Sequence, residues 1–266
     1  MQSTPRAPFV SVVIPAHNEA ESLPALIEEL QLVFAKHPGL WELLVVDDGS
    51  DDPTPAVLSV LGAQCEQLRP VRLDGRYGQS AALEAGFRSA RGDVIVMLDA
   101  DGQNPPHDIP RLLEALRDCD MVCGRRRQRR DSWLKRISSR IANGVRRAVL
   151  RDGIHDTGCS LKAFRRELAD RFKLYRGMHR FLPALAKIEG ARVREIDVEH
   201  RPRTRGTSHY GLGNRLVGPL LDLFVVVWMQ RRTLRWRIES EIQPAGLDAE
   251  THAQLPRYDA EYVSQP

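Results

Sequence analysis

The stretch VIVMLDADGQNPP, residues 94–106, places two acids directly after an apolar run. Its first five residues are apolar and mostly β-branched, which predicts a short buried strand. Asp99, Asp101 and Gln103 follow at alternate positions, and two prolines then end the extended run. Polar residues at the end of a buried strand are typical of a ligand site at the carboxyl edge of a sheet.

An alternation of strands and helices extends from this stretch in both directions. Apolar runs predict further strands at residues 9–15, 41–52, 70–75, 120–126 and 191–203. Apolar residues at helical spacing predict helices at 18–37, 54–65, 78–92 and 106–118. In the first helix, Asn18 is the expected cap, and the expected buried face is Leu23, Leu26, Ile27, Leu30 and Phe34. The pattern predicts an α/β fold with a mostly parallel central sheet flanked by helices.

In such a sheet, ligands bind outside the carboxyl ends of the strands. The unusual polar residues of this chain lie at those ends, at 15–19, 47–50 and 99–103. If the extended conformation continues past Asp99, then Asp99, Asp101 and Gln103 present oxygens to one side. Oxygen ligands suit Mg²⁺ or Mn²⁺. The alternative is that one acid caps the next helix while the other is solvated.

The charge of the chain is concentrated in one segment. Residues 125–151 hold eleven Arg or Lys residues and one acid, a net charge of +10, whereas the whole chain carries +4. A nucleic-acid-binding protein is one interpretation of this segment, although it leaves the strand-end acids unexplained. A dinucleotide-binding dehydrogenase is excluded because no GxGxxG follows the first strand.

The second half of the chain predicts two helices with apolar faces. One is a basic amphipathic helix at about 132–150, and the other contains a 14-residue apolar run, residues 216–229, that is too short to span a bilayer comfortably. Expected boundaries are a domain at 1–210, an interface helix region at 211–237 and a flexible tail at 238–266. Four cysteines without zinc-type spacing and the lack of a signal peptide favour the cytoplasm.

Four stretches in order, VSVVIPAHNEAESL, LLVVDDGSDD, GQSAALEAGFRSARGDVIVMLDADGQ and DMVCGRR, resemble the family 2 glycosyltransferases. These enzymes have the GT-A (Rossmann-like) fold. Within the family the chain is most similar to the branch of dolichyl-phosphate mannose synthases and undecaprenyl-phosphate sugar transferases. The resemblance runs from about residue 9 to 228. The ordered set is specific, while each piece alone is not.

The resemblance implies a set of site residues. Those expected to bind the nucleotide sugar are Pro15, His17, Glu19, Val46, Asp48, Asp99, Ala100, Asp101, Arg203 and His209. Asp99, Asp101 and Gln103 would hold the metal. Asp99, Asp101 and Arg126 would be catalytic, and Arg126 and Asp156 would bind the acceptor. Two positions depart from the family, which usually has tyrosine at His17 and often lysine at His209.

The resemblance also implies a reaction: inverting, metal-dependent transfer of a sugar from a UDP- or GDP-sugar to a polyprenyl phosphate. The protein would lie on the cytoplasmic face of the membrane, on anionic lipid, with a homo-oligomer or a membrane-protein partner as further options and no nucleic acid. One rival is a transferase of the same fold with a non-lipid acceptor. A processive synthase is the weaker rival, because Gln230 and Arg235–Trp236 do not have QxxRW spacing.

Overall fold

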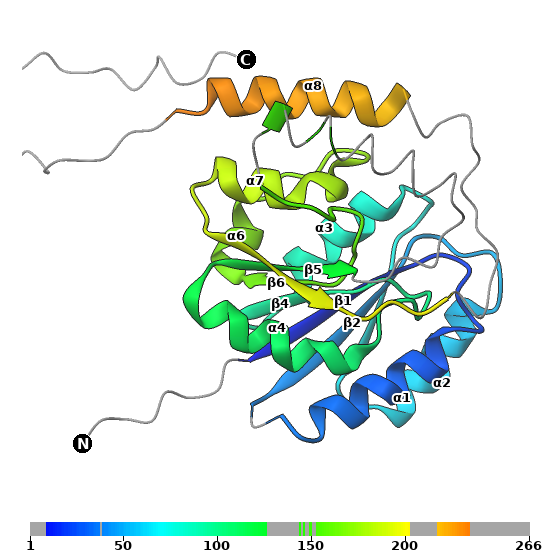
Figure 1. Cartoon of the computed structure of the whole chain (residues 1–266). Helices are drawn as coiled ribbons and strands as arrows, with labels where there is room; N and C mark the ends of the chain where they lie inside the picture. Colours follow the sequence, from blue (N-terminus) through cyan, green and yellow to red (C-terminus); the bar gives the residue numbers. More distant parts are fainter. Residues whose placement is uncertain are drawn as a thin grey trace, which may run out of the picture. The chain divides into compact units, whose positions relative to one another are not determined.

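The centre of the computed structural model is a seven-stranded sheet with the order β3-β2-β1-β4-β6-β5-β7 (Figure 1). The structure describes residues 9–37, 39–126, 144, 146, 149–150, 153–202 and 217–234. The strands are β1 (Val10–Ala16), β2 (Trp41–Asp47), β3 (Leu68–Arg72), β4 (Val94–Met97), β5 (Met121–Arg126), β6 (Lys162–Arg165) and β7 (Val193–Val198). Only β6 pairs antiparallel with its neighbours, β4 and β5, among these strands. The predicted mostly parallel sheet is confirmed.

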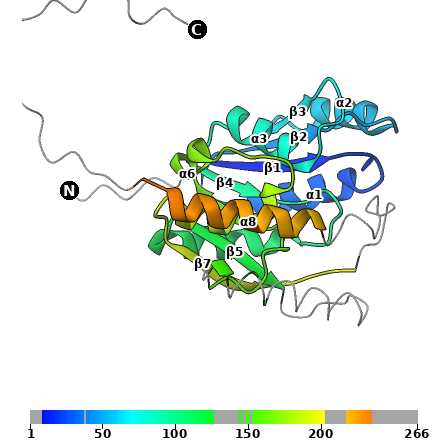
Figure 2. The same ribbon diagram turned by 90° about the horizontal axis from the view of Figure 1, so that it is seen from above.

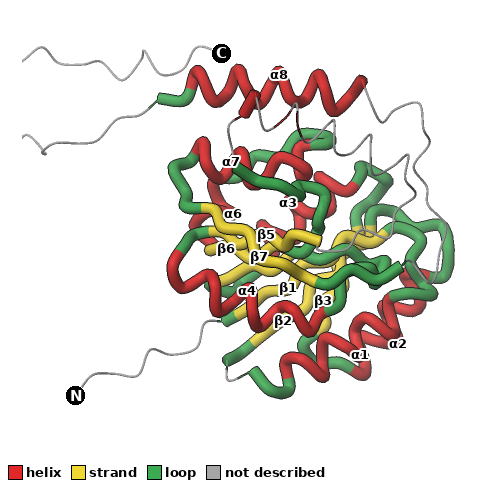
Figure 3. The backbone as a smooth tube through the Cα atoms, viewed as in Figure 1, coloured by secondary structure: helices red, strands yellow, loops and turns green. Residues whose placement is uncertain are grey.

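Helices cover both faces of the sheet (Figure 3). On one face lie α1 (Leu23–Phe34), α2 (Thr54–Gln64) and α4 (Ile109–Ala115). On the other lie α3 (Gln79–Ser89), α6 (Arg166–Arg171) and α7 (Leu182–Ile188). Three short 3₁₀ helices, η1 (Pro106–Asp108), η2 (Leu116–Asp118) and η3 (Met178–Phe181), adjoin α4 and α7.

The strands are buried on both sides because successive residues point to opposite faces. Val12 and Ile14 of β1 join the core with α1, whereas Val13 joins the core with α3. The five residues predicted as the buried face of the first helix are the buried residues of α1. Asn18 does not cap that helix. It has a φ of 58°, and Ser22 occupies the N-cap position.

Strand β6 was not predicted from the sequence. Its four residues, KAFR, include a lysine that is fully buried, and they carry no clear period-two pattern. Lys162 of β6 pairs with Met97 of β4, and Ala163 pairs with Val122 of β5. Because β6 lies between β4 and β5, it brings residues 156–162 beside the end of β4.

Helix α8 (Val217–Arg232) packs on α7 on the side away from the sheet (Figure 1), and it lies in front of the sheet when the molecule is seen from above (Figure 2). Leu223 and Val226 are buried in the core with α3, while Leu221, Phe224, Val225 and Trp228 are exposed. We call these four residues the apolar face of α8. No helix in the described ranges is long and apolar enough to cross a membrane.

The chain separates into two units, Met1–Arg232 and Thr233–Pro266. Most of the predicted basic helix at about 132–150 and all of the predicted tail at 238–266 lie outside the described residues. Arg203 and His209 lie outside them as well. The expected boundaries near 210 and 237 therefore stay predictions.

Candidate active site

A pocket of about 550 Å³ opens at the carboxyl ends of β1, β2 and β4, which are neighbours in the sheet. The strand ends contribute Pro15, Ala16, His17, Glu19, Asp48, Asp99, Ala100 and Asp101. Seven of these eight were predicted from the sequence as nucleotide-binding residues. The remaining lining comes from the start of α3 and from the segment before α7: Arg76, Tyr77, Gly78, Gln79, Ser80, Ala82, Arg176, Gly177, His179 and Arg180.

The loops after β1 and β2 are bonded to each other at the pocket mouth. His17 Nδ1 lies 2.9 Å from the carbonyl oxygen of Asp48. The N–H of Glu19 donates to Thr54 Oγ1, and the N–H of Asn18 donates to Ser50 Oγ. The left-handed backbone at Asn18 is supported by its side-chain bonds with Asp51. These bonds fix the Glu19 backbone at the rim.

Asp48 is buried, and its carboxylate holds the loop between β3 and α3. One oxygen accepts the Tyr77 N–H and the other accepts the Gly78 N–H, each at 2.7 Å. Gly78 has a φ of 95°, a conformation that favours glycine. Gly49 is similarly required, because a Cβ there would lie 2.7 Å from the backbone carbon of Gly75. Asp48 therefore sets the position of the Arg76–Gln79 wall.

Asp99 is partly buried at the base of the pocket. Burial, reinforced by the nearby Asp101 charge, raises the pKa of Asp99 to about 6, while Lys162 acts in the opposite direction. Gln79 Nε2 donates to Asp99 Oδ1 at 2.8 Å, and the Asp99 N–H donates to Ser160 Oγ. The Asp99 and Asp101 carboxylates repel each other, and a hard divalent cation bound by both would offset that repulsion.

The extended conformation does not continue past Asp99. The expectation that Asp99, Asp101 and Gln103 present oxygens to one side depended on that continuation. The chain turns at Ala100 and Asp101, and Gly102 has a φ of 68°. Asp101 Oδ1 accepts the N–H of Gln103, which closes the turn. Asp99 and Asp101 line the pocket, and Gln103 is not among its lining residues.

The wall opposite the strand ends is the segment Arg176–Arg180, which we call the RGMHR turn from its sequence. Ser80 Oγ accepts the N–H of Gly177 at 3.1 Å and lies 2.8 Å from His179 Nδ1. Burial, with a smaller effect from Arg180, lowers the pKa of His179 to about 3, so this imidazole is neutral at pH 7. Ser80 thereby attaches the RGMHR turn to the start of α3.

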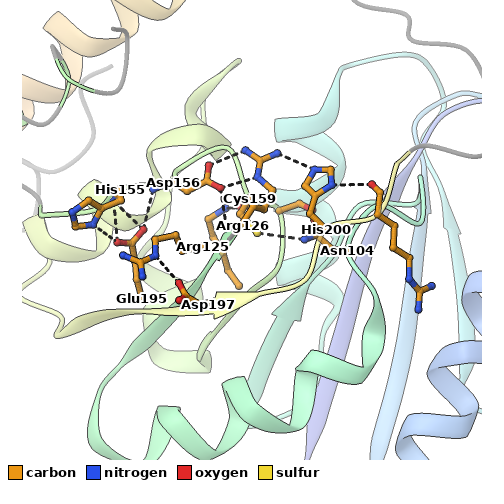
Figure 4. Close-up of polar contacts among 12 residues, drawn as sticks. Asn104, Arg125, Arg126, His155, Asp156, Cys159, Glu195, Asp197 and His200 are labelled. Carbon is orange, nitrogen blue, oxygen red and sulfur yellow. Dashed lines mark hydrogen bonds and ion pairs between the residues drawn. The ribbon is translucent and has the colours of Figure 1, made fainter. Parts of the chain in front are cut away.

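A cluster of ion pairs lies at the ends of β5 and β7 (Figure 4). Arg126 donates through Nε and Nη2 to the two carboxylate oxygens of Asp156, at 2.7 and 2.8 Å. Its Nη1 lies 3.4 Å from His200 Nε2. Both members of the pair are nearly buried, with 11% and 7% of their side chains exposed. Glu195 holds the N–H groups of His155 and Asp156, completing the cluster.

Besides Gln103, three more residues predicted from the sequence as site residues do not line the pocket. Val46 is fully buried and packs toward the Gly86 position of α3, so its side chain offers no surface to a nucleotide. Arg126 and Asp156 bind each other, and neither is a lining residue. Direct phosphate binding by Arg126 would require competition with Asp156, because all three of its guanidinium nitrogens are engaged.

Two groups of pocket residues were missed by the sequence reasoning. The loop Arg76–Ser80 follows the parallel strand β3, so the same carboxyl-edge reasoning would have found it. The RGMHR turn follows no parallel strand and joins α6 to α7. Nothing in its pattern signals that it folds back over α3.

A ligand pocket at the carboxyl edge of parallel strands, with helices on both faces, defines a Rossmann-like α/β protein. The family model of glycosyl transferase family 2 matches residues 11–172. The chain belongs to this family, and the family resemblance inferred from its sequence is confirmed.

The relatives of this chain are similar to it over most of its length. Undecaprenyl-phosphate 4-deoxy-4-formamido-L-arabinose transferase of Aeromonas hydrophila is 40% identical over 220 residues, which is 81% of this chain and 66% of that protein. Dodecaprenyl-phosphate galacturonate synthase of Rhizobium johnstonii is 37% identical over 232 residues, 85% of this chain and 68% of that protein. The chain thus spans about two thirds of the length of these relatives.

Solved structures confirm the GT-A fold. Glucosyl-3-phosphoglycerate synthase from Mycobacterium tuberculosis, in complex with Mn²⁺, UDP and glucosyl-3-phosphoglycerate, matches with a TM-score of 0.63. The match has 21% sequence identity and covers 81% of this chain and 80% of that one. The same synthase in complex with Mg²⁺ and UDP also gives a TM-score of 0.63, with 20% identity over 81% of this chain and 79% of that one.

Proposed function

We propose that this chain transfers a sugar from a UDP- or GDP-sugar to a polyprenyl phosphate of the undecaprenyl type. The observation that carries the proposal is the convergence of Asp48, Asp99 and Asp101 on one pocket from the ends of β2 and β4, in a family 2 chain. Both relatives described above are named for polyprenyl phosphates, which supports the acceptor class.

The donor occupies the part of the pocket formed by the strand ends in this proposal. Pro15, His17, Glu19 and Asp48 surround the nucleoside, with Asp48 acting mainly by holding the Tyr77–Gly78 backbone. Ala100, between the two acids, allows close approach of the diphosphate because its side chain is small. Arg76 extends the same wall and offers an exposed guanidinium to the ligand.

Asp99 and Asp101 are the residues proposed to hold Mg²⁺ or Mn²⁺, with Gln103 as a further oxygen donor after a side-chain rotation. The raised pKa of Asp99 supports this fit, because a cation relieves the repulsion that burial and Asp101 impose. Bound there, the cation would stabilise the charge that develops on the departing diphosphate.

The acceptor phosphate is ionised near neutral pH, so the proposed reaction needs no general base. One of its oxygens forms a bond to the anomeric carbon while the bond from that carbon to the donor diphosphate breaks. The nucleoside diphosphate leaves with the electron pair, and the anomeric configuration is inverted. A product of retained configuration would contradict this single displacement.

Arg126 and Asp156 form the acceptor side of the proposal, while Arg203 and His209 belong to its donor side. The Arg126–Asp156 pair acts there as a positioning element, since its charges are already mutually satisfied. Arg203 and His209 lie outside the described residues, but the N–H of Arg201 donates to the carbonyl oxygen of Gln103 at 2.8 Å. This bond holds the backbone of Arg201 beside Gln103, one of the proposed metal ligands.

The apolar face of α8 is proposed to rest on an anionic bilayer at the cytoplasmic side. Its four apolar residues are followed by the exposed Arg231 and Arg232, the combination that binds an interface through both burial and charge. The four buried free thiols suit a reducing compartment. Flotation with vesicles containing anionic lipid tests this. Unchanged flotation of a Phe224→Ser/Trp228→Ser variant would contradict it.

A donor screen tests the reaction. The chain is mixed with undecaprenyl phosphate in detergent, Mg²⁺ or Mn²⁺, and a panel of UDP- and GDP-sugars, and release of nucleoside diphosphate is measured. Asp101→Ala should lower turnover by about 100-fold or more, while Asp170→Asn, an exposed acid on α6, should not. Wild-type release without lipid phosphate, or no release with any donor, would overturn the proposal.

A further inference from the structure

The RGMHR turn brings two arginines to the pocket that the proposed reaction does not yet use. Arg176 and Arg180 both line it, and neither makes an ion pair within the described parts of the chain. Arg126, in contrast, is already occupied by Asp156. Two arginines beside one cavity, neither in a direct ion pair with a carboxylate of the described residues, are suited to bind an oxyanion by charge-assisted hydrogen bonds.

The backbone of the RGMHR turn is held from two sides. On one side, Ser80 of α3 accepts the Gly177 N–H. On the other, the Asp222 carboxylate of α8 packs so tightly that a Cβ at Gly177 would lie 2.7 Å from Asp222 Oδ2. Gly177 also has a φ of 85°, a conformation that favours glycine. The two arginines therefore project from a fixed turn.

Asp222 also links the turn to α8 electrostatically. It is the one acid in the α8 sequence, VGPLLDLFVVVWMQRR, and its charge interacts with Arg180. An acid in an otherwise apolar helix is costly unless a partner stabilises it. Leu221, the residue before it in the chain, belongs to the apolar face of α8. The pocket wall and the proposed lipid-facing surface thus meet at Asp222.

From this geometry we infer that Arg176 and Arg180 bind the phosphate of the lipid acceptor, with Asp222 as a positioning residue for Arg180. The inference rests on the proposed function. A polyprenyl chain lying along the apolar face of α8 would present its phosphate at the RGMHR turn. The donor diphosphate is the other source of the same oxyanion chemistry, and the experiment separates the two.

The test compares Arg176→Gln, Arg180→Gln and the double variant with Arg171→Gln, an exposed arginine at the end of α6. Apparent KM values are measured separately for donor and undecaprenyl phosphate. Each single change should raise the acceptor KM about tenfold, the loss of one charge-assisted contact, and leave the donor KM within about twofold. Arg180→Lys should recover part of the loss, and Arg171→Gln should match the wild type.

A second experiment measures the binding of a soluble prenyl phosphate in the absence of any sugar donor. Farnesyl phosphate should bind the wild type more tightly than farnesol, and the double variant should lose this difference. A raised donor KM with an unchanged acceptor KM would assign the arginines to the diphosphate and overturn the inference. Equal binding of both probes to the wild type would overturn it too. A wild type that binds farnesyl phosphate but turns over no donor would instead count against the proposed function.

Discussion

Two kinds of charged group surround this pocket, and they differ in whether the protein itself satisfies them. Asp48 and the Arg126–Asp156 pair are saturated by hydrogen bonds within the chain. Asp99, Arg176 and Arg180 carry charge that the described residues offset only in part. The first kind holds the fold in place, and the second kind is available to a ligand. Substitutions at the two kinds of position should therefore have opposite consequences.

The largest expected effect is the loss of stability in Arg126→Gln. The change leaves the nearly buried Asp156 carboxylate without its bidentate partner, which costs about 3–5 kcal/mol of unfolding free energy. Chemical denaturation measures it. The double variant Arg126→Gln/Asp156→Asn should recover part of the loss, because no unpaired charge then remains. A fully stable single variant that has lost acceptor binding would place Arg126 in the second kind instead.

Asp99→Asn should raise the stability of the chain, whereas Arg126→Gln should lower it. The folded pKa of about 6 lies above the ordinary value of 3.8, so the folded chain binds this proton more tightly than the unfolded chain does. The unfolding free energy of the metal-free wild type therefore falls as the pH rises from about 4 to 6, by up to about 3 kcal/mol.

In Asp99→Asn this part of the pH dependence should be absent, and the variant should be more stable than the wild type at pH 8 but inactive. Unfolding free energies at several pH values, measured in a chelator, check this. Identical pH profiles for the two proteins would show that Lys162 already neutralises Asp99 in the absence of metal.

The sequence predicted the wall formed by the strand ends far better than the opposite wall. His17, Asp48, Asp99 and Asp101 follow three strands of a repeating strand–helix pattern, and parallel strands bring their carboxyl ends together. Local pattern and topology are then enough to find the residues.

The opposite wall depends on contacts that no local pattern encodes. The RGMHR turn is held at the pocket by residues distant in the chain, among them Ser80, almost a hundred positions earlier, which contacts Gly177 and His179. The short strand β6, which places Asp156 and Lys162, has a buried lysine where a sequence pattern favours an apolar residue. Both features are decided by tertiary packing rather than by propensity.

Asp48→Ala tests a charged group of the first kind, which hydrogen bonds within the chain satisfy. The change removes the acceptors for two backbone N–H groups, so we expect about 2 kcal/mol of lost stability. The Tyr77–Gly78 loop would then be free to move, and the donor KM should rise by about tenfold while the acceptor KM stays unchanged. Thermal unfolding and steady-state kinetics check both. An acceptor KM that rises equally would mean that the loop serves both substrates.

The smallest expected effect is that of Asp222→Asn, which connects the two kinds of group. Asparagine keeps the shape against Gly177 but removes the charge that attracts Arg180. Because Arg180 stays in the pocket with a less defined position, the acceptor KM should rise about threefold at an unchanged donor KM. Asp170→Asn, the same change at an exposed acid on α6, is the matched control. Asp222→Asn combined with Arg180→Gln should be no worse than Arg180→Gln alone, because a positioning residue has no effect once the residue it positions is gone. Additive losses would show that Asp222 acts on the acceptor by another route.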